Sequence, residues 1–176
     1  MKTMKKVLSI ALVGAMMLSV AACGKGNYKI VDKKTFKNAL EDVADFDSDE
    51  IHDYEDYYDG AEHDLDCWDG NIRYEYIQFE DNEAAMDFFD DYYYEDFQDM
   101  VDDHDFSGTR FSSHTNTSAY IIINGESDSD DFFDDDIYGG FFCKEDTVVL
   151  VYAISDRQRD MDAVDEFLSA IGYPHP

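Results

Sequence analysis

The chain has 176 residues, of which 42 are acidic and only 13 are basic, and its formal net charge is −29 at pH 7. Such a charge excludes nucleic acid as a partner, because affinity for phosphates depends on lysine and arginine. Cationic molecules, proteins and divalent cations remain candidate partners. The 13 tyrosines and 13 phenylalanines exclude a disordered acidic tail, which is poor in aromatic residues. The composition therefore predicts an acidic surface around an aromatic-rich core.

The first 22 residues have the pattern of an export signal. Three lysines precede an apolar run over residues 7–18, which is shorter than the about 20 residues of a spanning helix. The run is followed by Val20-Ala21-Ala22-Cys23, which resembles the lipobox of bacterial lipoprotein precursors. In that family the cysteine thiol receives a diacylglycerol, the signal is cleaved on the amino side of the cysteine, and the new N-terminus is often acylated.

This resemblance implies a cell-envelope lipoprotein that is anchored through Cys23 to the outer, extracytoplasmic face of the cell membrane, since two or three acyl chains give stable anchoring. An ordinary secretory signal cleaved after Ala22 is the alternative. Cleavage before Cys23 removes three lysines and no acid, so the net charge becomes −32. We expect a signal peptide over 1–22, a lipidated tether over 23–32 and a single acidic domain over 33–176, because this length suits one compact domain.

The periodicity of apolar residues predicts the elements of that domain. In chain order they are a helix over 33–44, a mostly irregular acidic stretch over 45–70, a strand over 72–79, a helix from Asp81 or Asn82 to about Met100, strands over 109–113 and 118–124, an acidic loop over 125–136, a hairpin over 137–143 and 147–154, and a helix to about Ala170. Residues 148–151 are apolar throughout, which is typical of a central strand. The predicted fold class is α+β, an antiparallel sheet of four or five strands with about three helices mainly on one face.

Two cysteines remain once Cys23 is assigned to the lipid anchor. In a protein outside the cytoplasm an even pair of this kind favours a disulfide, here between Cys67 and Cys143. The alternative is a pair of buried thiols that behave as small apolar residues.

One acidic segment suggests a calcium site. Residues 45–56 follow the first predicted helix and place Asp45, Asp47, Asp49, Asp53 and Asp56 in a pattern that resembles an EF-hand loop. The segment departs from that motif at two positions, with Glu50 where glycine makes the turn and Asp56 where a bidentate glutamate belongs. A looser cation site, here or over 128–136, is the alternative.

Other catalytic and metal signals are weak. The histidines and Cys67 match no zinc-ligand spacing, so the histidines are interpreted as surface residues. The chain has no nucleophile elbow, Gly-rich phosphate loop or His-Glu-x-x-His motif. A set of aromatic residues is interpreted either as a ligand groove or as core packing: Tyr54, Tyr57, Tyr58, Trp68, Tyr92, Tyr93 and Tyr94.

These observations lead to three hypotheses for function. The first is a non-enzymatic, lipid-anchored interaction or ligand-binding module. The second is an acidic domain whose loops bind calcium, and the third is a cell-envelope enzyme, whose catalytic carboxylates the sequence cannot single out from 42 acids. The first hypothesis accounts best for the residues, and it needs no cofactor.

Overall fold

The strands of the domain form one antiparallel sheet. The computed structural model describes residues 28–129, 132–133 and 135–176, and within these ranges seven strands occur in the spatial order β1-β2-β3-β7-β6-β5-β4. Their bounds are β1 His52–Tyr54, β2 Ala61–Asp69, β3 Ile72–Phe79, β4 Phe106–Thr115, β5 Ser118–Ser127, β6 Asp136–Lys144 and β7 Thr147–Ala153. Two meanders, β1 to β3 and β4 to β7, are joined by the pairing of β3 with β7.

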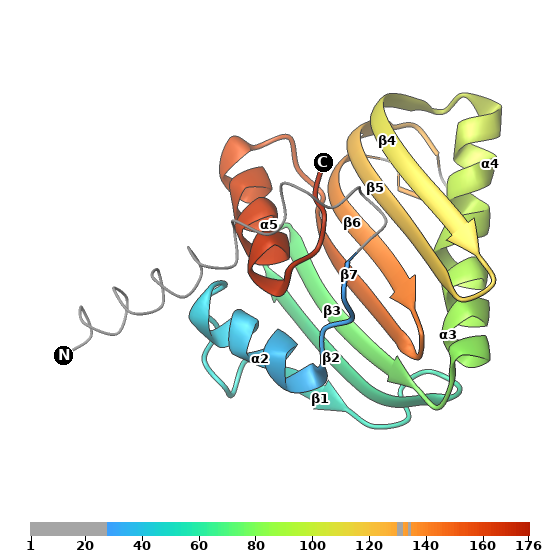
Figure 1. Cartoon of the computed structure of the whole chain (residues 1–176). Coiled ribbons are helices and arrows are strands. Elements are labelled where there is room, and N and C mark those ends of the chain that lie inside the picture. The colour runs from blue at the N-terminus through green and yellow to red at the C-terminus, as the bar shows by residue number, and fades with distance from the viewer. Residues whose placement is uncertain (1–27, 130–131, 134) are drawn as a thin grey trace.

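Helices cover both faces of this sheet, as Figure 1 shows. Helices α2 (Lys33–Asp42) and α5 (Gln158–Ile171) pack on one face, where they share a core cluster with Tyr74 and Val149. Helices α3 (Asn82–Phe89) and α4 (Glu95–Asp103), with the π-helical segment η1 (Asp90–Tyr94) between them, pack on the other face with Ile77 and Leu150. We refer to these as the α2/α5 face and the α3/α4 face.

The α+β class and the antiparallel sheet are confirmed, whereas the predicted number of four or five strands is wrong. Both additional strands, β1 and β2, lie in the stretch over 45–70 that was interpreted as mostly irregular. The prediction that helices lie mainly on one face is also wrong, because the two core clusters divide the helices between the faces. The sheet is buried on both sides near its centre, and every residue of β7 is buried.

The long helix predicted from Asp81 or Asn82 to Met100 forms with one interruption. Asp81 caps it, since its side chain accepts a hydrogen bond from the backbone N–H of Ala84 at 3.0 Å. The π-helical segment at Asp90–Tyr94 widens one turn, and such segments often mark functional sites. His104, in the left-handed conformation with φ 69°, ends α4. The helix carries acids at its C-terminal end, which oppose its dipole, so packing against the sheet must stabilise it.

The N-terminal boundary of the packed domain lies earlier than residue 33. Tyr28 and Val31 are buried on the α2/α5 face, and the Tyr28 ring packs edge-on against Phe142 with centroids 5.3 Å apart. Lys144 Nζ donates to the Tyr28 carbonyl at 2.9 Å. The chain from Tyr28 onward therefore carries its own two-sided core. Cys23 and the predicted signal peptide lie outside the described residues, and no helix within the described part has the length and apolarity needed to span a membrane.

Candidate functional site

Four charged residues of β2 and β3 lie together on the α3/α4 face. Ile77 packs with α3 on that face, and Arg73 and Glu75 share its side because residues two apart along a strand do so. The register pairs Asp64 with Ile77 and Asp66 with Glu75, and paired residues point to the same face. We call Asp64, Asp66, Arg73 and Glu75 the charged cluster.

Arg73 neutralises two of the three carboxylates. Its Nε donates to Asp66 Oδ1 at 3.1 Å and its Nη2 donates to Glu75 Oε1 at 2.9 Å. The guanidinium carbon lies 5.4 Å from the centre of the Trp68 ring, within the range of a cation–π interaction. The tyrosine Tyr58 adds a hydrogen bond from its hydroxyl to Glu75 Oε1 at 3.2 Å.

Asp64 is the member of the cluster that the fold does not satisfy. Its side chain is 1% exposed, and within the described residues neither of its carboxylate oxygens has a hydrogen-bond partner. Glu75 Oε2 is in the same situation. A buried carboxylate without partners is unfavourable by several kcal/mol, in order of magnitude, unless it takes up a proton or meets a cation. Asp64 is therefore suited to hold either a proton or a cation.

Burial changes the acidity of both carboxyl groups. The pKa of Asp64 is raised to about 6, mainly by loss of hydration and also by repulsion from Asp66, although Arg73 opposes this shift. Burial also raises the pKa of Glu75 to about 8, although Arg73 opposes this shift. Both groups thus exchange protons within two pH units of neutrality, whereas ordinary carboxyl groups do so near pH 4.

Exposed tyrosines surround the cluster on the same face. Tyr57, Tyr92 and Tyr54 are 62%, 58% and 41% exposed. Ring contacts join them, with centroid distances of 5.3 Å from Tyr54 to Tyr57, 4.8 Å from Tyr57 to Tyr58 and 6.3 Å from Tyr58 to Tyr92. These rings come from β1, from the loop after it and from η1. We call Tyr54, Tyr57, Tyr58 and Tyr92 the tyrosine surface.

An acidic pocket opens beside the tyrosine surface. Its volume is about 440 Å³, and it is lined by Asp56, Tyr58, Asp59, Gly60, Ala61, Glu62 and Glu80. Four of these residues are carboxylates and none is basic. The Glu80 N–H donates to the Gly60 carbonyl at 3.0 Å and ties the two sides of the pocket together. Tyr58 lines the pocket and also hydrogen-bonds Glu75, so its side chain stands between the pocket and the charged cluster.

The predicted calcium ligands are not brought into one group. They are spread along the chain, with Asp45 and Asp47 in an irregular segment, Asp49 in a turn, Asp53 in strand β1 and Asp56 in the bend after it. The strand occupies the end of the segment, where an EF-hand would have the last part of its loop. Asp53 pairs with Lys33 Nζ at 2.9 Å. Within the described residues, no three His, Cys, Asp or Glu side chains are arranged to hold a metal ion.

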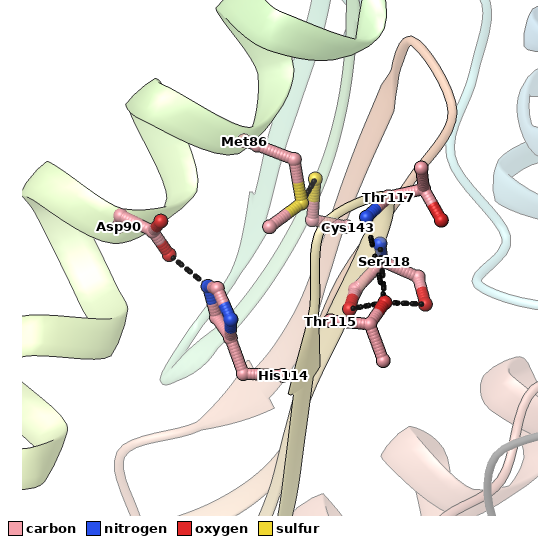
Figure 2. A network of polar contacts seen from close by, with 7 residues as sticks. All are labelled: Met86, Asp90, His114, Thr115, Thr117, Ser118 and Cys143. Atoms are coloured by element: carbon pink, nitrogen blue, oxygen red, sulfur yellow. Dashed lines mark hydrogen bonds and ion pairs between the residues drawn. The ribbon is translucent and has the colours of Figure 1, made fainter.

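The structure does not form the predicted disulfide. Cys67 and Cys143 are both buried free thiols, and they belong to the core clusters on opposite faces. Strands β3 and β7 also lie between their strands, which places them about 14 Å apart at the usual strand spacing. A disulfide needs Cα atoms within about 7 Å. Cys143 instead contacts Met86, with its Sγ 3.5 Å from the methionine sulfur (Figure 2).

In the part of the chain that the structure describes, the histidines do not gather into a metal-binding group. His114 Nε2 lies 2.8 Å from Asp90 Oδ1 and connects β4 with η1, as Figure 2 shows. His52 stacks on Tyr54 with ring centroids 5.9 Å apart, and His104 ends α4. Each histidine named here has a local structural role.

The sequence interpretation missed the charged cluster. Arg73 and Glu75 were assigned to the polar side of a strand, and Asp64 and Asp66 fell in the stretch without assigned structure. The signal that could have found them is the alternation of Asp64 and Asp66 with Leu65 and Cys67, which is a strand pattern whose second face is charged. Comparisons of the chain with models of protein families, with curated proteins and with solved structures find no match.

Proposed function

We propose that the protein is a lipid-anchored extracytoplasmic binding module without catalytic activity, and that its tyrosine surface, with the charged cluster beneath it, receives a cationic ligand or protein segment. The observation that carries this proposal is Asp64, a buried carboxylate with no partner in the described structure, next to exposed tyrosine rings. Aromatic faces and carboxylates both attract cations, the first through the ring quadrupole and the second through charge.

The charge of the whole chain supports a cationic partner. At −32 after removal of residues 1–22, the protein attracts positive molecules from a distance and repels anions. Such long-range attraction raises the association rate of a cationic partner but does not define its binding site. The tyrosine surface is suited to be that site, because Tyr57 and Tyr92 expose large rigid rings next to the acidic pocket, and tyrosine is enriched at binding surfaces.

Acid–base catalysis is a second candidate, and the raised pKa values of Asp64 and Glu75 favour it. Neither residue lines the pocket of about 440 Å³. Because Tyr58 stands between that pocket and Glu75, a substrate would have to displace it before reaching either carboxyl group. Binding at the exposed rings of Tyr57 and Tyr92 needs no such displacement, so binding accounts for the geometry better than catalysis does.

The single tryptophan gives a direct test. Trp68 is half exposed and contacts Arg73 of the charged cluster, so its fluorescence should respond when a cation binds beside the cluster. We would titrate residues 24–176 with a lysine decapeptide at low and high salt. The double substitution Tyr57→Ser and Tyr92→Ser leaves the net charge unchanged. It should weaken binding of the peptide about tenfold, since each of the two exposed cation–π contacts contributes about 0.5–1 kcal/mol.

The control is Phe111→Ser, which removes an exposed aromatic ring from the opposite face of the sheet. It should leave the titration unchanged. Equal weakening by Phe111→Ser and by the tyrosine variant, or equal affinity for all three proteins, would show that the peptide binds through net charge alone. Either outcome contradicts a binding site at the tyrosine surface.

A further inference from the structure

Strand β4 ends the sheet on one side and leaves a long edge open. Within the described residues it pairs only with β5, over ten consecutive residues without a register shift. Its outward N–H and C=O groups therefore have no strand partner in the described part of the chain. Such a row of backbone groups is a template for pairing with another strand.

The opposite edge shows what a protected edge looks like in this protein. Strand β1 has three residues, and Asp53 and Glu55 lie in it or directly after it. Short edge strands and charged side chains are common devices against edge-to-edge pairing. Strand β4 is long and carries little of this protection, since it contains ten residues, no proline and a single charged residue, Arg110.

The segment around β4 also lacks the acids that dominate the rest of the chain. No aspartate or glutamate occurs between Asp105 and Glu126, although about one residue in four is acidic elsewhere. Two copies of a chain with net charge −32 repel each other over most of their surfaces. At β4 they can approach edge to edge without bringing carboxylates together, whereas a cationic partner would be drawn to the acidic faces instead.

The open edge is held in a fixed shape. His114 at one end of β4 contacts Asp90 of η1, and Thr115 Oγ1 closes the turn into β5 by accepting from the Ser118 N–H at 3.1 Å (Figure 2). At the other end, the Phe106 ring lies over Gly108 and Gly125. An edge that is already in strand geometry loses little conformational freedom on pairing.

We propose that β4 pairs antiparallel with β4 of a second copy of this chain, across a two-fold axis perpendicular to the sheet. Closed two-fold dimers are the commonest assemblies of identical chains. With Phe111 on the axis, Arg110 faces Ser112 of the second copy and the two guanidinium groups stay apart. Phe111 is 41% exposed and points to the α2/α5 face, where it pairs with Ile122. In the proposed dimer, the Phe111 rings of the two copies contact each other on that face.

The proposed pairing is compatible with attachment of both copies to one membrane. A two-fold axis perpendicular to the sheet keeps the α2/α5 faces of both copies on the same side. Tyr28 is buried on that face in each copy, and Figure 1 shows the blue segment before α2 on the side of the sheet that carries α2 and α5. The segments that lead to Cys23 therefore start from the same side of the dimer. This compatibility rests on the proposed anchoring, but the strand pairing does not.

Sedimentation of residues 24–176 at low salt (roughly 0.02 M) and high salt (roughly 0.5 M) tests the proposal, because salt screens repulsion between the copies. We expect a monomer–dimer equilibrium that shifts to the dimer at high salt. Phe111→Glu should raise the dimer dissociation constant at least about tenfold, since like charges opposite each other destabilise strand pairs. Tyr92→Glu adds the same charge at another exposed aromatic residue and should leave the dimer intact.

A cross-linking experiment separates β4 pairing from other modes of association. Phe111→Cys places a thiol next to its copy at the axis and should give a disulfide-linked dimer on mild oxidation. Ser107→Cys lies on the same strand and face but four residues from the axis, and it should not cross-link. A monomer at every salt concentration, a dimer that persists in Phe111→Glu, or equal cross-linking at both positions would overturn the proposal. Circular dichroism of each variant checks that it is folded.

Discussion

At the scale of single residues, Asp64 and Glu75 are carboxyl groups that the fold keeps from water without fully compensating their charge. Arg73 and Tyr58 both bind the same oxygen of Glu75. The other oxygen of Glu75 and both oxygens of Asp64 have no hydrogen-bond partner in the described structure. The folded structure therefore favours the protonated form of each group more than water does. The free energy of unfolding must then depend on pH.

The sign of this dependence follows from the raised pKa values, about 8 for Glu75 and about 6 for Asp64. A raised pKa in the folded protein means that protonation favours the folded state. The stabilising contribution is complete below pH 4, where the unfolded chain is protonated too, and it is lost as the pH rises through 6 and then 8. We expect the melting temperature to increase as the pH falls from 8.5 to 5.

Asp64→Asn should remove the Asp64 part of this effect. At pH 8 the variant should be more stable than the natural protein by about 3 kcal/mol, which is the free energy that corresponds to the raised pKa of Asp64, and the difference should vanish near pH 4. Urea unfolding at several pH values measures it. Asp59→Asn, which removes an exposed charge from the neighbouring loop, is the control. If both variants change the free energy of unfolding equally at every pH, burial of Asp64 does not cause the pH dependence.

At the scale of elements, glycines allow strand β6 to pack against its neighbours. Gly139 has φ 152°, and a Cβ atom there would lie 2.3 Å from the Val151 carbonyl oxygen. Gly140 lies under the Phe142 ring, where a Cβ atom would come within 2.4 Å of the ring. A side chain at Gly139 would therefore push β6 away from β7, the central strand, whereas a side chain at Gly140 would displace the Phe142 ring of its own strand.

Gly139→Ala should therefore destabilise the protein by more than about 2 kcal/mol, as expected when a substitution overpacks a core and also strains the backbone. The matched control is Gly70→Ala, which has φ 61° but open space around its Cβ position. Its cost should be limited to about 1 kcal/mol of backbone strain. Thermal unfolding of the two variants compares them, and equal losses would mean that contact with β7 does not matter.

Elements with a regular apolar period were predictable from the sequence. The strand over 72–79 was located at its observed bounds, and residues 148–151 were recognised as part of a central strand. The stretch over 45–70 was not, because β2 contributes only Leu65 and Cys67 to the α2/α5 core and Ala61 to the α3/α4 core, and acids alternate with them. The charged cluster was missed for the same reason, since buried carboxylates look like exposed ones in a chain this acidic.

At the scale of the whole molecule, the proposed anchor and the packed domain are separated by a few residues. Four residues lie between Cys23 and Tyr28, so the five steps from one Cα atom to the other reach at most about 18 Å when the chain is extended. A lipidated chain would thus hold its α2/α5 face near the membrane, since Tyr28 is buried on that face. The tyrosine surface, on the opposite face, would be turned outward.

Cys23→Ser tests the anchor. In cells that express the full chain, the natural protein should be recovered with membranes and in the detergent phase after Triton X-114 partition, because two or three acyl chains hold it there. The variant should move to the aqueous phase. Cys67→Ser, which removes a buried thiol, is the control and should remain with the membranes. Recovery of the Cys23 variant in the detergent phase would contradict the lipobox interpretation.

The pairing of β3 with β7 also sets the order in which the protein can fold. Within each meander, strands that follow one another along the chain pair through short turns, but Ile77 meets Val148 and Ile72 meets Ala153 across most of the domain. Contacts between distant residues form slowly, because a long loop must close before they stabilise anything. Strand β7 is the last strand of the sheet and completes both β3 and β6. A chain that emerges N-terminus first therefore keeps its first meander open at β3 until nearly its whole length is available.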